Sequence, residues 1–451
     1  MTKTLPYKKE LLKNTISMAW PAVVECFFVA FAGFIDSLMV SSLGPYAVAA
    51  VGLTTQPKFV GLALFTAISV SVSAIVARRR GENNRTSAHD TLVTAFVTVV
   101  VASIIMSGLF VWLAEPIIRL CGSSPQTHSD ATLYLRIIMG GMIFNCVQTC
   151  INSAQRGAGK TKITMVTNLA SSGVNVLFNY ILIGGKFGFP ALGIKGAAIA
   201  TVMGTAVGCF MSIKSLFKKD GFLNIKFIFQ EKIRPRFESL KKIVYFGYSI
   251  FIEQVLLRVG LMATAIMAAD MGDYEMAAHQ VAMNIMSLSF SFGEGLQSAS
   301  VALIGRSLGA KDKELAKEYG KTCQFIGGIT TIVLAIAFMC GAKGIMNMFF
   351  SEEKIVRIGI YLTWVIIPIV LFQIRQIVYM GCLRGAGDTA FTAFVSVISV
   401  SVVRTVISYI CAYILGLGIV GVWLGIFADQ FGRFLASRKR FKSGKWTEIK
   451  V

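Results

Sequence analysis

Arg156-Gly157-Ala158-Gly159, followed by Thr161, recurs 228 residues later as Arg384-Gly385-Ala386-Gly387, followed by Thr389. Other segments recur at the same offset, which slips by three residues near the end of the chain. These pairs are Gly44–Ala50 with Gly272–Ala278, Arg78 with Arg306, Glu25 with Glu253 and, after the slip, Leu192-Gly193-Ile194 with Leu417-Gly418-Ile419. The period is too long for a solenoid repeat. It indicates a duplicated half-protein, which in a membrane chain is typical of transporters.

The composition is that of a membrane protein. The chain has 451 residues, of which 55% are hydrophobic and 15% are charged, and its mean hydropathy is +0.68. A soluble fold of this length could not bury so much apolar surface, so lipid must solvate most of it. The net charge of +21 would suit a nucleic-acid-binding protein if the basic residues formed patches. They lie between apolar runs instead, so we expect membrane lipid as a partner and no nucleic acid.

Apolar runs long enough to cross a bilayer fall into two sets of six. They lie at 15–42, 52–77, 91–113, 132–155, 162–184, 192–217, 243–270, 276–305, 320–348, 357–382, 390–415 and 418–436. Because six is even, both halves enter the membrane from the same side and are related by an axis along its normal. The predicted fold is an all-α membrane protein with an amino-terminal lobe (1–220), a basic linker (221–242) and a carboxy-terminal lobe with a basic tail (243–451).

Lysine and arginine residues alternate between the predicted loops. The amino terminus, the Arg78–Arg80 loop, the linker and the tail around Arg438–Arg440 are basic, whereas the loops on the opposite side carry few such residues. The positive-inside rule therefore places both termini in the cytoplasm, in the cell's inner membrane. We expect a multi-pass monomer.

The chain shows no motif for a metal, a cofactor or catalysis. Its nine cysteines are scattered without a CxxC pair and its three histidines lie far apart, so we expect no metal site and no cofactor besides a coupling ion. Gly159-Lys160-Thr161 is not a phosphate-binding loop, since Ala154 stands where that motif needs a glycine. HExxH and GxSxG are absent, which argues against a membrane enzyme.

Asp36 lies deep in the first predicted span, among apolar residues. An acid at this depth is costly unless it faces a cavity or a partner, so it is a functional candidate by default. Its carboxyl group could bind and release a proton, or ligate sodium. The alternative is a helix-packing acid that is hydrogen-bonded to its neighbours.

Asn175 and Asn179 are four residues apart, so their amides share one face of a helix. Both can contact a carboxyl group or a cation. They could equally join neighbouring helices by hydrogen bonds. We expect Thr201 of the sixth span to belong to the same cluster.

Several motifs in order resemble the multidrug and toxic compound extrusion (MATE) family of secondary transporters. They are a proline-containing first helix with Asp36, Leu43-Gly44 with Ala49-Ala50-Val51-Gly52-Leu53, Arg156-Gly157-Ala158-Gly159, Asn175 with Asn179, Leu192–Ala198, Ala277-Ala278-His279-Gln280, and Leu383–Thr389. The resemblance covers nearly the whole chain. It implies twelve helices in two lobes around a central cavity, and export of organic cations against an inward flow of protons or sodium ions.

The resemblance also implies an ion site in the amino-terminal lobe, formed by Asp36 beside the asparagine pair. The family often has Asp at the position of Asn179. Members with a second site carry an Asp where this chain has Gln373, so we expect coupling through Asp36. At the repeat offset Asp36 becomes Thr264, Asn175 becomes Val403 and Asn179 becomes Ile407, which also assigns the ion to the amino-terminal half.

Glu25 and Glu253 have two possible roles. They could line a substrate cavity or a second cation site, to which we also assign Gln254, Arg258 and Gln373. They could instead form ion pairs with Arg258, Arg375 or Arg404. Glu294 is a weaker candidate for gating or pairing.

The predicted function is a cation-coupled antiporter that exports amphipathic organic cations and drugs by alternating access. The alternative is an exporter or flippase of a single endogenous metabolite or lipid-linked compound. The sequence identifies neither the small-molecule substrate nor the coupling ion.

Overall fold

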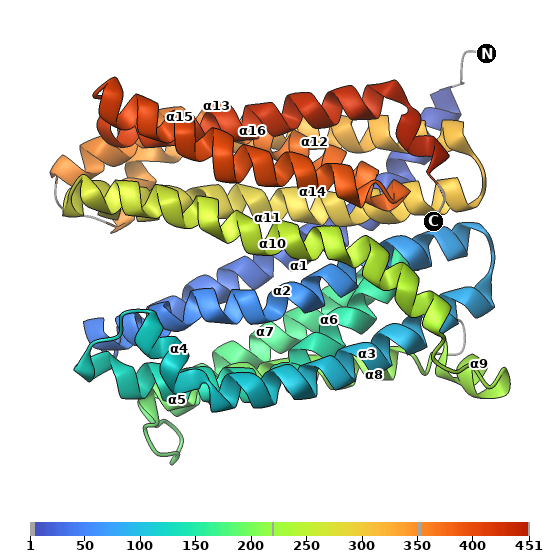
Figure 1. Ribbon diagram of the computed structural model, residues 1–451, viewed down its shortest axis with the longest axis horizontal. Coiled ribbons are helices and arrows are strands. Elements are labelled where there is room, and N and C mark those ends of the chain that lie inside the picture. Colours follow the sequence, from blue (N-terminus) through green and yellow to red (C-terminus); the bar gives the residue numbers. More distant parts are fainter. Residues whose placement is uncertain (1–4, 219–220, 350–352, 450–451) are drawn as a thin grey trace. The chain divides into compact units, whose positions relative to one another are not determined.

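The computed structural model describes residues 5–218, 221–349 and 353–449, and its regular elements there are helices (Figure 1). The long elements of the first half are α1 (Leu5–Ser41), α2 (Pro45–Gly81), α3 (Arg85–Trp112), α5 (Pro125–Gly140), α6 (Met142–Gly157), α7 (Thr161–Gly184) and α8 (Gly193–Ser215). Two short helices, α4 (Ala114–Leu120) and α9 (Ile225–Gln230), lie in connections.

The second half begins with α10 (Phe237–Asp270), α11 (Asp273–Gly309), α12 (Lys313–Phe349) and α13 (Glu353–Ala386). The next predicted span combines α-helical and π-helical turns, in α14 (Thr389–Val397), η1 (Ile398–Arg404), α15 (Thr405–Tyr409) and η2 (Ile410–Ile414). The chain ends with α16 (Gly418–Ser443) and the short η3 (Lys445–Glu448).

Each of the twelve predicted spans falls on a helix or on a run of consecutive helices. Ten helices of the described chain are long and apolar enough to cross a membrane, and α5 with α6, bent by 44°, forms an eleventh candidate. The helix α11 is not among these candidates. Its sequence contains polar residues such as Glu275, Glu294 and Arg306, which lower its hydropathy.

Glycines at equivalent repeat positions form the turns between helices. Gly44 and Gly272 precede α2 and α11 with φ angles of 103° and 128°. Gly159 and Gly387, in the repeated Arg-Gly-Ala-Gly turn, have φ angles of 73° and 96°. An L-residue with a side chain rarely adopts such angles, so the duplicated glycines serve the backbone of the turns.

The described helices form two compact units. One extends from Val24 to Phe251, and the other combines the chain up to Val23 with Ile252–Val451. We call them the first unit and the second unit. The helices α1 and α10 each contribute to both units. The predicted domain bounds at 220 and 242 follow the sequence repeat, not packing, and they stay a prediction.

Within the first unit α2 packs against α3, α5 and α6, and α7 pairs along its length with α8 (Figure 1). The α7–α8 crossing is close because Gly204 has no side chain. A Cβ on Gly204 would lie 2.6 Å from the carbonyl oxygen of Ser171 and 2.9 Å from Cβ of Asn175. Small residues at helix contacts are typical of membrane proteins.

Within the second unit α13 is central, packing against α11, α12 and α16. The helix α12 exposes a stripe of large apolar side chains at helical spacing, formed by Phe325, Ile329, Ile332, Val333 and Ile336. In water such a stripe would be unfavourable, whereas lipid solvates it. The chain is therefore a multi-pass membrane protein.

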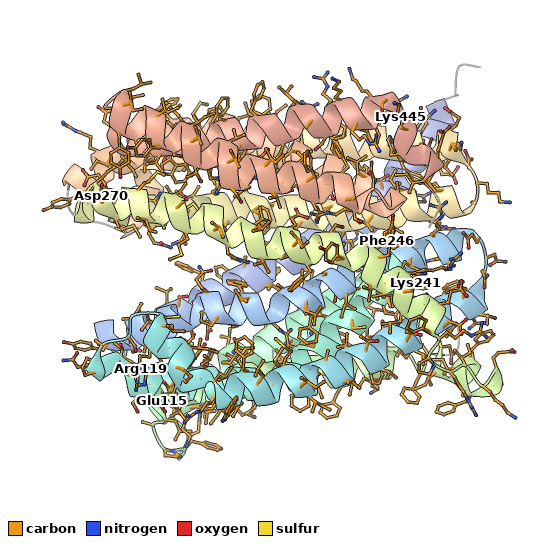
Figure 2. The ribbon with its side chains drawn as sticks, in the orientation of Figure 1. Glu115, Arg119, Lys241, Phe246, Asp270 and Lys445 are labelled. Atoms are coloured by element: carbon orange, nitrogen blue, oxygen red, sulfur yellow. The ribbon has the colours of Figure 1, made fainter. Side chains whose placement is uncertain are left out.

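Figure 2 shows charged residues near the ends of each unit's helices. In the first unit Glu115 and Arg119 lie at the end opposite Lys241. In the second unit Asp270 and Lys445 lie at opposite ends. The sequence places Lys241 and Lys445 on the predicted cytoplasmic side, and this orientation stays a prediction.

Candidate ion-coupling site

Asp36 of α1 accepts a hydrogen bond on Oδ1 from the side-chain amide of Asn179 on α7. The carboxyl group is half-buried, and Asn179 is fully buried. The amide oxygen of Asn179 has no hydrogen-bond partner among the described residues. A buried oxygen of this kind could ligate a cation or accept a hydrogen bond from a protonated carboxyl group.

An apolar cluster surrounds this pair within the first unit. It contains Val40 of α1, Ala47 of α2, Tyr134 of α5, Ile183 of α7 and Ala197 of α8. Val40 lies one turn after Asp36, and Ile183 lies one turn after Asn179. Five helices thus enclose the carboxyl group in a setting of low polarity, where electrostatic interactions are stronger than in water.

The amide of Asn175 donates a hydrogen bond to the hydroxyl of Thr201 on α8, at 3.1 Å. Gly204 permits this contact, since it lets α7 and α8 approach closely at Asn175. The predicted cluster is therefore present as two linked pairs, Asp36 with Asn179 and Asn175 with Thr201. The two asparagines connect the pairs along one face of α7.

The sequence analysis overlooked two ionisable residues beside Asp36. Lys58 of α2 and Tyr134 of α5 both interact electrostatically with the Asp36 carboxyl group. Lys58 lies inside the predicted span 52–77, so the depth argument that singled out Asp36 applies to it equally. Tyr134 gives no such signal in the sequence, because tyrosine is common in membrane helices.

Glu25 of α1 forms an ion pair with Arg156, with 2.8 Å between Oε1 and Nη1. Thr164 donates a hydrogen bond to its other carboxylate oxygen at 2.7 Å, and Asn168 donates to Oε1 at 2.5 Å. Asn168 in turn accepts a hydrogen bond from Gln148. Glu25 is thus the centre of a buried polar network that joins α1, α6 and α7.

Glu253 of α10 has the equivalent partner in the second unit. One terminal nitrogen of Arg384 lies 2.7 Å from both carboxylate oxygens. Arg384 also donates to Thr392, the repeat counterpart of Thr164. The expected ion-pair partners Arg258, Arg375 and Arg404 were therefore wrong for both glutamates, because the arginines of the repeated turn reach back to them.

Arg404 belongs to a different cluster of the second unit. It bonds to Asp429 of α16 at 2.5 Å, and Asp429 also pairs with Arg433 at 2.9 Å. All three residues are buried. Neither Asp429 nor Arg433 was singled out from the sequence, although Asp429 is an acid inside a predicted span.

The remaining predicted site residues lie apart from Asp36 in sequence and belong to the second unit. Gln373 is buried on α13 and accepts a hydrogen bond from Ser289 of α11 at 2.5 Å. Gln254 and Arg258 are half-buried on α10, and Glu294 is exposed on α11. A role for these residues in a cavity or a second cation site stays a prediction.

Comparison with known proteins identifies the family. The family model MatE matches residues 21–181 and 249–410, two segments that begin 228 residues apart and so reproduce the internal repeat. The chain is 26% identical over 443 residues to "Probable multidrug resistance protein NorM" of Thermotoga maritima, covering 98% of this chain and 94% of the relative. A Bacillus anthracis protein of the same name is 29% identical over 434 residues, covering 92% and 91% of the two chains.

Among solved structures, the "Outward-facing conformation of a multidrug resistance MATE family transporter of the MOP superfamily" superimposes with a TM-score of 0.89 at 22% identity. The match covers 96% of this chain and 97% of that chain, so the two share the whole fold. The family model spans well over half of the sequence, in both halves. The chain belongs to the MatE family of membrane transporters.

Proposed function

We propose that this chain is a cation-coupled antiporter that exports amphipathic organic cations and drugs by alternating access, with protons or sodium ions as the coupling ion. The names of its relatives as multidrug resistance proteins support the substrate class. The hydrogen bond between Asp36 and Asn179 inside an apolar cluster is the observation that carries the coupling role.

The chemistry of that pair supplies a mechanism. The ionised Asp36 carboxylate accepts a hydrogen bond from the Asn179 amide nitrogen. A protonated carboxyl group is also a donor, which the unpartnered amide oxygen of Asn179 can accept after the amide rotates. A sodium ion would use the same oxygen as a ligand. Either ion therefore changes the hydrogen bonding of α7.

The asparagine pair can transmit this change to α8. Asn175 lies one turn from Asn179 and is hydrogen-bonded to Thr201. A rotation or shift of α7 therefore alters its contact with α8 in the same step. Alternating access requires an element with two arrangements that the ion biases, and we assign this role to the α7–α8 pair.

Glu25 and Glu253 hold structural positions in this proposal. Each is buried and paired with an arginine of the repeated turn. A carboxylate already neutralised by a guanidinium is a weak attractor for a further cation. Their repetition in both halves also fits a shared frame better than a coupling site.

The proposed setting follows from the distribution of basic residues. We place the protein in the cell's inner membrane as a monomer, with both termini in the cytoplasm. Its partners in this proposal are small-molecule organic substrates and lipid.

Export from everted membrane vesicles tests the proposal. Asp36→Asn should insert normally but lose gradient-driven transport of a fluorescent organic cation, because an amide does not bind a proton in this range. Asp130→Asn is the matched control, since Asp130 is an exposed carboxylate of the same unit. Undiminished transport by Asp36→Asn at equal protein levels would rule the proposal out.

A further inference from the structure

Lys58 is a cationic side chain within an apolar helix. The stretch Tyr46–Gly81 that contains it has a mean hydropathy of 2.3, and Lys58 itself is half-buried. A lysine at this depth is expensive unless an anion or a water-filled cavity compensates it. The carboxylate of Asp36 is an anion with which Lys58 interacts electrostatically.

The helical geometry explains how the two residues meet. Ala47, Val51 and Lys58 lie on one face of α2, because they are separated by four and seven residues. Ala47 and Val51 pack in the apolar cluster that contains Val40, one turn from Asp36. Side chains of a helix tilt toward its amino-terminal end, so the Lys58 side chain extends along this face toward that cluster.

The axial distances agree with this placement. The turn after Ser41 reverses the chain between α1 and α2. Asp36, four residues before Val40, is therefore displaced by roughly 6 Å from the level of Ala47 toward Lys58. Lys58, eleven residues beyond Ala47, is displaced by roughly 16 Å in the same direction. The remaining axial gap of roughly 10 Å is one that an extended lysine side chain spans in large part.

The charges around Asp36 form a small set. Lys58 of α2 is the cation and Tyr134 of α5 is a neutral phenol, and both interact with the carboxyl group. The helices α7 and α8 contribute Asn179 and Thr201, which are uncharged. With Asp36 ionised, Lys58 already balances the negative charge of the site.

The internal repeat links Lys58 with Asp36 independently. At the offset of 228 residues Asp36 becomes Thr264 and Lys58 becomes Met286. Both charges are thus confined to the amino-terminal half, whereas the ion pairs of Glu25 and Glu253 occur in both halves. The carboxylate and the ammonium are gained or lost together between the halves.

We propose that Lys58 is a specificity-determining residue that occupies the place of a metal cation beside Asp36, so that the site responds to protons and rejects sodium. This inference rests on the proposed antiport function. A sodium ion needs a shell of oxygen ligands and would meet the ammonium group in a site that has one carboxylate and is already neutral. A proton bonds to one carboxylate oxygen and needs no such shell.

Transport by the full chain in proteoliposomes tests this inference, with a pH gradient or a sodium gradient imposed alone and ethidium as the transported cation. Wild type should respond to the pH gradient and not to sodium. Lys58→Gln, which removes the charge, should gain sodium-driven transport of at least about tenfold over wild type. Lys58→Arg, which keeps the charge, should behave as wild type. Lys58→Met, the residue at the repeat position, is a second neutral variant in case Lys58→Gln does not fold.

Binding of radioactive sodium to the purified protein provides a second readout, which a purely structural role for Lys58 would not change. We expect none for wild type and saturable binding for the neutral variants. Sodium-driven transport by wild type, or folded neutral variants that still reject sodium, would overturn the inference alone, provided that wild type uses a gradient and Asp36→Asn does not. If neither gradient drives wild type, the proposed function fails as well.

Discussion

Arg156 and Glu25, which are 131 residues apart, form an ion pair with 2.8 Å between Nη1 and Oε1. Arg384 and Glu253 are also 131 residues apart and pair at 2.7 Å. In each unit the arginine of a cytoplasmic-side turn thus reaches a glutamate in the first helix of its repeat. The duplicated motif that opens the sequence analysis is therefore half of a structural lock, whose other half is the duplicated glutamate.

Removing the charge of Glu253 should destabilise the protein. Glu253→Gln leaves Arg384 buried without a compensating anion, which costs about 3 kcal/mol in comparable buried pairs. We expect the free energy of unfolding in detergent to fall by about this amount. Glu115→Gln is the control, because Glu115 pairs with Arg119 at an exposed position and such pairs contribute about 0–1 kcal/mol. Equal effects of the two substitutions would contradict the buried lock.

The glycine of the repeated turn should not tolerate a side chain. A Cβ on Gly385 would lie 2.6 Å from the carbonyl oxygen of Val301 and 2.9 Å from its Cα. Gly385→Ala should therefore force α13 away from α11 and lower the melting temperature. Gly328→Ala on α12, where a Cβ meets nothing within 4 Å, should raise stability by about 0.5–1 kcal/mol through helix propensity. A neutral Gly385→Ala would show that the α11–α13 contact is looser than described.

The two asparagines of α7 should differ in their effect on transport. Asn179→Ala removes the hydrogen bond to Asp36, so it should abolish most gradient-driven export. Asn175→Ala removes a bond to Thr201, so it should behave like Thr201→Ala, and the double substitution should cost little more than either alone. Initial rates in everted vesicles measure all four variants. Additive losses from Asn175 and Thr201 would separate residues that the structure joins.

Cysteine labelling should report the orientation. Cys121 is exposed in the connection after α4, on the predicted outer side. An impermeant maleimide should label it in intact cells. Lys160→Cys in a Cys121→Ser background places a thiol in an exposed cytoplasmic turn, so it should react only after permeabilisation. The reverse pattern would invert the predicted topology.

The positions of the membrane spans were predictable because hydrophobicity and length alone define them. The bend between α5 and α6 was not, since the span lacks proline and the break lies at Gly140 and Gly141. The π-helical turns around Arg404 also have no signal in apolar periodicity. Such details depend on packing between helices that are distant in sequence.

The candidate site was partly predictable. Asp36 and the asparagines were found because polar groups at bilayer depth are rare, and the structure brings Asp36 to Asn179. The glutamate–arginine pairs were missed because each arginine was interpreted as a loop charge. Their shared offset was a usable signal, since a glutamate and an arginine duplicated together have a common structural reason. Lys58 was missed although the depth argument applied to it.

The most direct test of the central claim is ethidium transport by purified Asp36→Asn in proteoliposomes with an imposed pH gradient, compared with wild type and Asp130→Asn. The account predicts gradient-driven transport by wild type and by Asp130→Asn, and none above the leak by a folded Asp36→Asn. Gradient-driven transport by Asp36→Asn at the wild-type rate would contradict the assignment of ion coupling to Asp36.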